Sequence, residues 1–197
     1  MRLIYIIYRK FRTQISSLLF RVLISDFSFK KKIKISSFSV ININGPFYIG
    51  GDFFSGEDLY ISTNKFCKLS IGKKIMFGPG IYILGGNHKF REVGSYLYDV
   101  KKDDKKTKDI TIEDDTWVGA NSKILSGSII SEGCIIGAGS VVNSYIPPYT
   151  IAAGAPCKSI YPRFKFHDLK SHLLKINSKF RIEEIIDIYE KHNIKLK

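Results

Sequence analysis

The chain has 197 residues, of which 44% are hydrophobic and 25% charged, a composition that excludes a disordered chain and fits one domain with appendages. Its net charge of +13 is concentrated at the ends: residues 1–34 carry nine Lys or Arg against one acidic residue, whereas residues 110–162 carry two against four. Nucleic-acid-binding proteins place basic side chains on the folded recognition surface, so this distribution argues against a nucleic-acid partner.

Residues 1–25 predict an amphipathic helix. Apolar side chains recur at spacings of four and three residues, at Ile4, Tyr8, Phe11, Ile15, Leu18 and Val22, which is one helical stripe. Such a stripe can cover the open end of a repeat fold, and this cap is the role we expect for residues 1–34. The alternative is that the basic helix lies on an anionic membrane surface.

Cysteine usage and the N-terminal composition bear on the compartment. Cys67, Cys134 and Cys157 stand at unrelated spacings and form no CxxC pair, which favours a reducing compartment. The N-terminus lacks the pattern of a secretory signal, and its longest uncharged run, Thr13 to Phe20, is too short to span a bilayer. We therefore expect a cytoplasmic protein, with peripheral attachment at the inner face of the membrane left open.

A six-residue period organises the stretch from Ile112 to Pro147. A branched aliphatic residue stands at Ile112, Val118, Ile124, Ile130, Ile136 and Val142, and a small residue follows four positions later at Thr116, Ser122, Ser128, Cys134 and Ser140. This period fits neither a helix nor an alternating strand and is typical of a β-solenoid. The aliphatic residues are expected inside a narrow prism, with the small residues at its corners. Gly119 and Gly137 are expected to relax the corner dihedrals.

The period also sets the domain boundaries. It begins less regularly at Ile35, stops after His88 and resumes at 110. Residues 89–109 carry seven basic and five acidic side chains, and a loop of this length inside a compact repeat is usually functional. We expect a β-helix over residues 35–162 with an excursion at 89–109, followed by a helical tail over 163–197 that forms a second cap.

Several segments of the chain resemble the hexapeptide-repeat acyltransferases. They are Asn87-His88, W-V-G-A-N at 117–121, I-G-A-G-S at 136–140, and I-P-P-Y-T-I-A-A-G-A-P-C-K at 146–158. The resemblance is nearest to the maltose and galactoside acetyltransferases and to the sugar O-acetyltransferases of bacterial surface polysaccharides. It implies a left-handed parallel β-helix, although the general rule for parallel crossovers predicts right-handed connections. It also implies acetyl-CoA as co-substrate and a homotrimer with sites at its seams.

His88 is the candidate general base for transfer to a sugar hydroxyl. It is the one histidine in the repeat region, because the other three lie in the tail, and histidine titrates near neutral pH. The resemblance implies that Asn87 positions the substrate or His88. It assigns the backbone N–H of Ala120 to the developing oxyanion. Trp117 beside it is either a site residue or a packing residue at the subunit interface.

The expected acetyl-CoA path follows the long axis of the solenoid. Ala120 and Ala138 are 18 residues apart, which is three hexads, so they should stack at one corner of adjacent coils. Asn143 and Ser144 are expected further along this path. By resemblance, Lys158 meets the phosphorylated nucleotide end, and Arg163 is expected to assist it.

The expected function is acetyl-CoA-dependent O-acetylation of a carbohydrate acceptor in bacterial surface polysaccharide (capsule or O-antigen) biosynthesis. N-acetylation of an amino-sugar, or acetylation of a xenobiotic such as an antibiotic, would use the same residues, and both alternatives stay open. A carbonic anhydrase on this fold needs about three histidine ligands for zinc, which one histidine cannot supply, so no metal is expected. A non-enzymatic scaffold also stays open, because fold alone does not give function.

Overall fold

The computed structural model describes residues 32–100 and 107–196, and near the N-terminus residues 7, 8, 11, 12, 14, 15, 18 and 19. Its strands are β1 (Ile33–Ile35), β2 (Val40–Ile43), β3 (Phe47–Ser55), β4 (Tyr60–Thr63), β5 (Leu69–Phe77), β6 (Tyr82–Gly85), β7 (Ile110–Ile112), β8 (Trp117–Val118), β9 (Lys123–Leu125), β10 (Ile129–Ile130), β11 (Ile135–Ile136), β12 (Val141–Val142), β13 (Tyr145–Ile146), β14 (Thr150–Ala153) and β15 (Ser159–Pro162). Its helices are α2 (Phe166–Ile176) and α3 (Ile182–Lys191).

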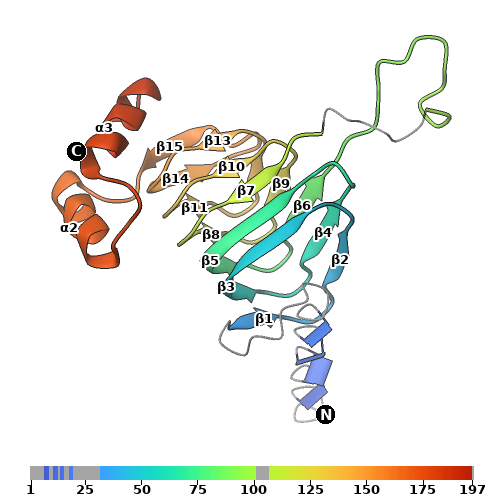
Figure 1. Cartoon of the computed structure of the whole chain (residues 1–197), viewed down its shortest axis with the longest axis horizontal. Helices are drawn as coiled ribbons and strands as arrows, with labels where there is room; N and C mark the ends of the chain where they lie inside the picture. The colour runs from blue at the N-terminus through green and yellow to red at the C-terminus, as the bar shows by residue number, and fades with distance from the viewer. Residues whose placement is uncertain are drawn as a thin grey trace.

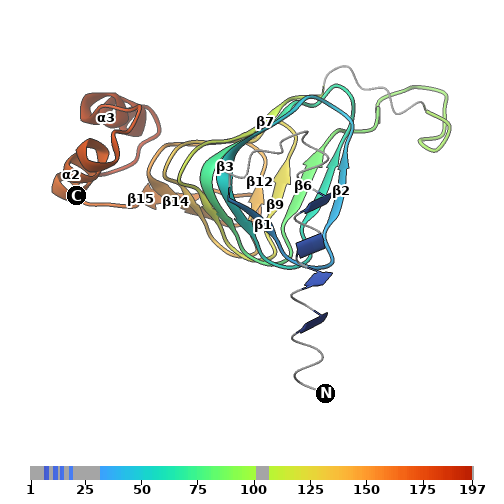
Figure 2. The ribbon, with the colours of Figure 1, turned by 60° about the horizontal axis from the view of Figure 1, so that its bottom comes forward.

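The strands wind into a three-sided prism (Figure 2). The first face holds the first halves of β3 and β5 with β7, β10 and β13. The second face holds β1, the second halves of β3 and β5, and then β8, β11 and β14. The third face holds β2, β4, β6, β9 and β12. All these pairs are parallel, and β15 alone returns antiparallel along β14. The prediction of a parallel β-solenoid is confirmed.

Three corners connect the faces, and the turns of the coil that contains β7, β8 and β9 define them. The first corner is the turn at 113–116, between the first and second faces. The second corner is the turn at 119–122, between the second and third faces. The third corner is the turn at 126–128, where the chain passes from the third face back to the first.

The hexad pattern is confirmed by burial. Each of the six aliphatic positions exposes at most 1% of its surface, and all five small residues are buried. The hydroxyl-bearing ones close the corner turns: Thr116 Oγ1 donates to the carbonyl of Glu113 at 2.8 Å, and Ser140 Oγ donates to the carbonyl of Gly137 at 2.6 Å. A small side chain is needed here because it fits inside the turn and satisfies a carbonyl that the turn would otherwise leave unpaired.

The expected role of Gly119 and Gly137 was wrong. Positive φ angles occur three residues after the aliphatic position instead, as at Asp115 (53°), Asn121 (59°) and Gly139 (70°). A Cβ on Gly119 would lie 2.6 Å from the backbone nitrogen of Ala138 in the next coil. Glycine follows the aliphatic residue because neighbouring coils approach too closely for a side chain.

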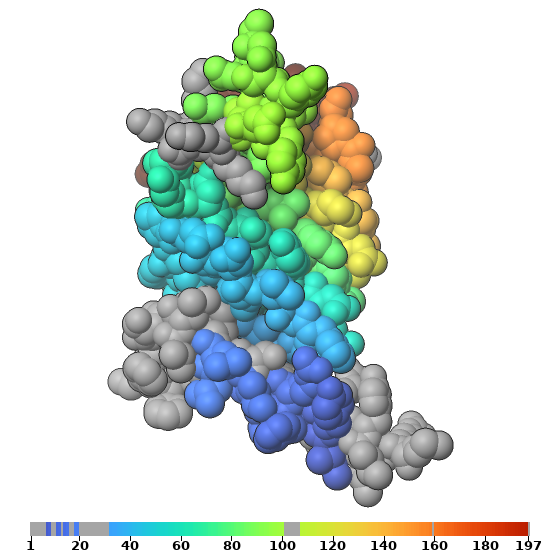
Figure 3. All heavy atoms as spheres, turned by 90° about the vertical axis from the view of Figure 1, so that its right-hand side faces the viewer, coloured from blue at the N-terminus to red at the C-terminus, as the bar shows by residue number. Residues whose placement is uncertain are grey.

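The coils before the excursion are longer than the regular ones. Trp117 pairs with Ile135, 18 residues later, whereas Ile33 pairs with Phe53 and Phe53 with Ile75, at separations of 20 and 22 residues. The less regular period of this half therefore reflects longer coils. The excursion leaves the third corner after β6 and projects away from the prism (Figures 1 and 3). In its described residues it contains no helix or strand.

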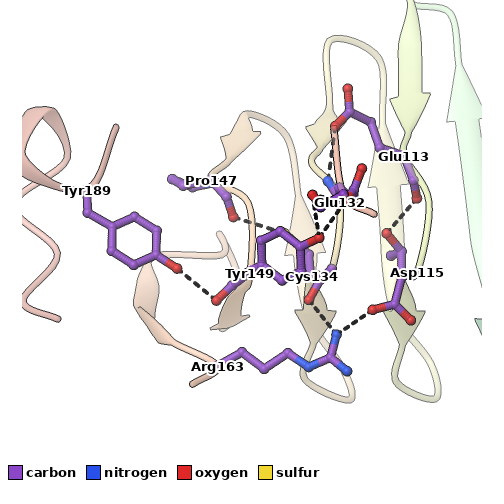
Figure 4. Close-up of polar contacts among 11 residues, drawn as sticks. Glu113, Asp115, Glu132, Cys134, Pro147, Tyr149, Arg163 and Tyr189 are labelled. Atoms are coloured by element: carbon purple, nitrogen blue, oxygen red, sulfur yellow. Dashed lines mark hydrogen bonds and ion pairs between the residues drawn. The ribbon is translucent and has the colours of Figure 1, made fainter. Parts of the chain in front are cut away.

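The tail forms two helices with a core of their own. Helices α2 and α3 bury Leu169, Leu173 and Ile185 in a cluster that includes Tyr149 of the last coil. The Tyr189 hydroxyl donates to the carbonyl of Tyr149 at 2.9 Å (Figure 4) and to the carbonyl of Pro148 at 2.9 Å. These contacts tie the helical unit to the end of the solenoid.

A buried carboxylate anchors the same unit along the first corner. Glu132 is 6% exposed and accepts hydrogen bonds from the hydroxyls of Tyr149 and Ser178. One coil earlier, Lys179 pairs with Glu113 at 2.7 Å. Because these contacts reach back to Glu113, the tail packs beside the first corner as well as against the last coil.

Most of the expected N-terminal helix lies outside the described residues. The eight described positions have helical backbone, and Ile7, Phe11 and Leu18 among them are exposed. The Arg12 guanidinium lies 4.5 Å from the centre of the Phe38 ring. Within the described part of the chain, no helix is long and apolar enough to cross a membrane. The choice between cap and membrane attachment stays a prediction.

The short distance between Gly119 and the backbone of Ala138 predicts the effect of a substitution on stability. Gly119→Ala should lower the free energy of unfolding by about 1–3 kcal/mol, because the added methyl group forces two coils apart. Chemical denaturation followed by circular dichroism measures this. Val93→Ala is the control, because the Val93 side chain is 98% exposed in the excursion and its replacement leaves the stacked coils unchanged. Equal stability of the Gly119→Ala variant and the parent protein would show that the coils are not in close contact here.

Candidate functional site

His88 lies at the third corner, where the chain leaves β6 for the excursion. It opens onto a pocket of about 400 Å³, which we call the third-corner pocket. The pocket is lined by Asn42, Asn44, Ser62, Thr63, Asn64, Leu84, Gly85, Gly86, Asn87 and His88. These residues come from the ends of β2, β4 and β6, three successive strands of the third face. Figure 3 looks onto this face, with the excursion at its top.

The local backbone explains why His88 projects here. Gly86 has φ +145°, and a Cβ on it would lie 2.9 Å from Nδ2 of Asn64 in the preceding coil. Asn64 Nδ2 also donates to Thr107 Oγ1 at 3.0 Å, while its Oδ1 accepts from the Phe66 N–H at 3.0 Å. Asn64 therefore contacts both ends of the excursion: it lies beside Gly86, just before the excursion begins, and it binds Thr107, near where the excursion ends.

The side chains of Asn87 and His88 are both exposed. Among the described residues, neither makes a hydrogen bond or an ion pair. Within the described part of the chain, the imidazole is therefore available to accept a proton from a bound hydroxyl. Catalytic histidines often acquire their hydrogen bonds only when substrate is bound.

Ala120 and Ala138 stack at the second corner, as predicted. The Gly139 N–H donates to the carbonyl of Ala120 at 2.8 Å, which places the two alanines in adjacent coils. No acceptor for the Ala120 N–H is found among the described residues. A Cβ on Gly78 would lie 2.7 Å from that nitrogen. The corner thus presents bare backbone with an unpaired donor, which can stabilise a developing oxyanion.

Trp117 occupies an outward position on the second face, three residues before Ala120. It is 48% exposed and aligns with Met76 in the preceding coil and with Ile135 in the next. The same register extends this outward apolar row to Phe54, Ile151 and Tyr161. Trp117 can therefore border a site at the second corner or contact another protein surface.

The two predicted basic residues lie apart. Lys158 is exposed near the second corner, where its N–H donates to the carbonyl of Ala153 at 3.0 Å. Arg163 lies at the first corner, where it pairs with Asp115 at 2.8 Å and donates to the carbonyl of Gly133 at 2.9 Å. The structure does not bring Arg163 together with Ala120, because β15 carries the chain away across the second face.

Asn143 and Ser144 lie at the third corner, on the same side of the prism as His88. Their strand β12 pairs with β9, which pairs with β6, so they lie two coils beyond His88, or about 10 Å at the usual strand spacing. The predicted site residues are thus divided within one chain. Trp117, Ala120, Ala138 and Lys158 gather at the second corner, and Asn87, His88, Asn143 and Ser144 at the third.

The sequence reasoning missed the polar residues of the earlier coils. Asn44 and Asn64 follow β2 and β4 directly, just as Gly86 follows β6. They recur at 20 and 22 residues, the spacing of the longer coils, and a search at 18 residues passes over them. Each of the three strands is followed by an asparagine or a glycine, and this common feature is the signal that could have identified Asn44 and Asn64.

The cysteines provide no nucleophile at either corner. Cys67, Cys134 and Cys157 are free and buried, and burial raises the pKa of Cys67 to about 11 and that of Cys134 to about 12. The thiolate is the reactive form, so a raised pKa makes these groups inert near neutral pH. The described part of the chain holds no group of three or more His, Cys, Asp or Glu side chains that could bind a metal.

Comparison with known proteins agrees with the fold. Residues 109–144 match the family described as bacterial transferase hexapeptide (six repeats). The chain is 30% identical to a galactoside O-acetyltransferase of Lactococcus lactis, over 58% of this chain and 56% of that protein. It is 31% identical to the galactoside O-acetyltransferase of Escherichia coli, over 57% and 52% of the two chains. A solved maltose O-acetyltransferase from Clostridium difficile 630 is 24% identical, with a TM-score of 0.40 and coverage of 59% and 66%.

The molecule is thus a parallel β-solenoid built from hexads. Within this solenoid, residues 109–144 are similar to the bacterial transferase hexapeptide family. The chain spans about half the length of the two galactoside O-acetyltransferases it matches.

The buried thiols lead to a prediction that also concerns assays. At pH 8 the native protein should react with a disulfide reagent at less than about one thiol per chain within minutes, because raised pKa values leave little thiolate. All three cysteines should react once denaturant is added. Prompt reaction of all three in the native protein would contradict the burial. Because the protein's own cysteines react slowly with the reagent, the thiol of released coenzyme A can be measured in the presence of the protein.

Proposed function

We propose that the protein is an acetyl-CoA-dependent acetyltransferase that modifies a sugar hydroxyl. The supporting observation is that the chain has both chemical parts of such a site: an uncommitted His88 in a polar pocket and the unpaired N–H of Ala120 on a bare corner. The names of the two galactoside O-acetyltransferases support this choice. We extend the proposal to a left-handed winding and to a role in surface polysaccharide biosynthesis, as the family resemblance implies.

In this proposal His88 acts as general base. The imidazole takes the proton of the acceptor hydroxyl while the hydroxyl oxygen attacks the thioester carbonyl of acetyl-CoA. The Ala120 N–H stabilises the negative charge that develops on the carbonyl oxygen. The carbon–sulfur bond then breaks, and the departing thiolate of coenzyme A receives the proton from the imidazolium. No covalent enzyme intermediate is needed, which is consistent with three buried cysteines.

Acetyl-CoA fits the second corner. Ala120 and Ala138 present methyl groups there, and exposed Lys158 can meet a phosphate of the nucleotide end. Arg163 is already paired with Asp115, so its assistance requires breaking that ion pair. Asn143 and Ser144 belong to the other corner and would contact acetyl-CoA bound along a neighbouring copy.

A complete site requires a second copy of the chain. His88 and Ala120 lie at different corners of the prism, and the third-corner pocket includes no residue of the second corner. We propose a homotrimer in which the third corner of one copy meets the second corner of the next. The exposed row of Met76, Trp117 and Tyr161 provides apolar surface for such an assembly.

Substitution of His88 tests the proposal. His88→Ala should lower acetyl transfer by about 100-fold or more, because the attacking hydroxyl loses its base, while acetyl-CoA affinity stays the same. Thiol release measures the turnover, and calorimetry measures the affinity. His167→Ala is the matched control, because that side chain is 96% exposed in the tail. A folded His88→Ala variant with full turnover would remove His88 from the mechanism.

A further inference from the structure

The lining of the third-corner pocket is almost free of charge. Apart from His88, its lining residues carry no ionisable side chain, and four of them are asparagines. The protein as a whole carries a net charge of +13, so an uncharged lining is not a consequence of composition. The neutral lining therefore restricts what can bind next to His88.

The strand register of the third face shows that the pocket runs across strands β2, β4 and β6. Asn42 on β2 pairs with Ser62 on β4, and Ser62 pairs with Leu84 on β6. Asn44, Asn64 and Gly86 form the next row, directly after the three strands. Both rows cross two coil spacings, or about 10 Å. A ligand whose reactive hydroxyl is at His88 therefore lies over the carboxamides of the two preceding coils.

Two of the carboxamides have unused hydrogen-bonding capacity. Asn44 Nδ2 donates to Asn42 Oδ1 at 3.1 Å and to the carbonyl of Thr63 at 3.0 Å. In the described part of the chain, Asn42 Nδ2 and Asn44 Oδ1 have no partner. Both side chains are exposed. An amide donor thus stands beside an amide acceptor at the mouth of the pocket.

This pairing fits adjacent sugar hydroxyls. A hydroxyl group both donates and accepts, so one hydroxyl can accept from Asn42 while its neighbour donates to Asn44. A carboxylate or phosphate only accepts, so it would face the carbonyl oxygen of Asn44 without a compensating donor. It would also lose water without gaining a cationic partner from any described lining residue other than His88, which is costly.

We propose that the third-corner pocket binds an uncharged sugar through adjacent hydroxyls, using Asn42, Asn44 and Ser62, and selects against sugars that carry a carboxylate or phosphate. Asn64 positions the pocket by holding the base of the excursion. The inference rests on the proposed function, because it names the acceptor of that reaction. The negatively charged co-substrate and the neutral acceptor then approach from different corners.

Matched acceptor pairs test the selectivity. Lactose is compared with its uronate derivative, and cellobiose with cellobiouronate, because each pair differs by one carboxylate and a disaccharide can span the roughly 10 Å from His88 to the asparagines of β2. We expect kcat/KM to be at least about tenfold higher for the uncharged member, the ratio expected for about 1.4 kcal/mol of discrimination. Equal or better use of the uronates would overturn the inference.

Variants test the residues. Asn42→Ala and Asn44→Ala should each raise the acceptor KM by up to about tenfold, the loss expected for one net hydrogen bond. The KM for acetyl-CoA and the melting temperature should not change. Ser70→Ala is the control, because Ser70 occupies an outward strand position on the first face. Unchanged acceptor KM in both asparagine variants would also overturn the inference.

Two measurements distinguish failure of the acetyltransferase proposal from failure of the acceptor inference. Calorimetry with acetyl-CoA and thiol release are measured on the same parent protein. If acetyl-CoA does not bind and no acceptor of either class is acetylated, the acetyltransferase proposal fails and the acceptor inference fails with it. If acetyl-CoA binds and the charged acceptors are preferred, only the acceptor inference fails.

Discussion

The structure depends on the close stacking of backbone from coil to coil. At the second corner, Gly119 lies so near the Ala138 nitrogen that even a Cβ would be 2.6 Å away. Parallel hydrogen bonding and buried aliphatic side chains hold the coils at this spacing. Because the coils stack, equivalent corner residues of successive coils lie next to one another along the solenoid axis. Together these residues form a continuous surface. The site therefore consists of corners, and the coils act as their scaffold.

Much of the fold could be predicted from sequence because its period is strict. The aliphatic and small residues of 112–142 are buried as expected, since each hexad supplies one inward side chain and one filled corner. The glycines were misinterpreted, because sequence cannot distinguish a glycine required by its own φ from one required by a neighbouring coil. The docking of Lys179 and Ser178 beside the first corner was also hidden, since these contacts join distant segments without any shared period.

The candidate site was only partly predictable for a related reason. His88 and Ala120 carry recognisable motifs, but the separation of the two corners follows from the winding of the chain. Asn44 and Asn64 were missed because the coils before the excursion are longer than three hexads. Arg163 was placed by its proximity in sequence to Lys158, whereas the antiparallel β15 carries it to Asp115.

The central claim is that each site combines the third corner of one copy with the second corner of another. Co-expression of two inactive chains tests it most directly: His88→Ala removes the base, and Ala138→Tyr fills the second corner. Mixed trimers, purified through a different tag on each chain, should regain about a third of the parent activity, because every trimer that contains both chains has two intact corners at one of its three seams. Mixed oligomers that form but stay inactive would contradict a site shared between copies.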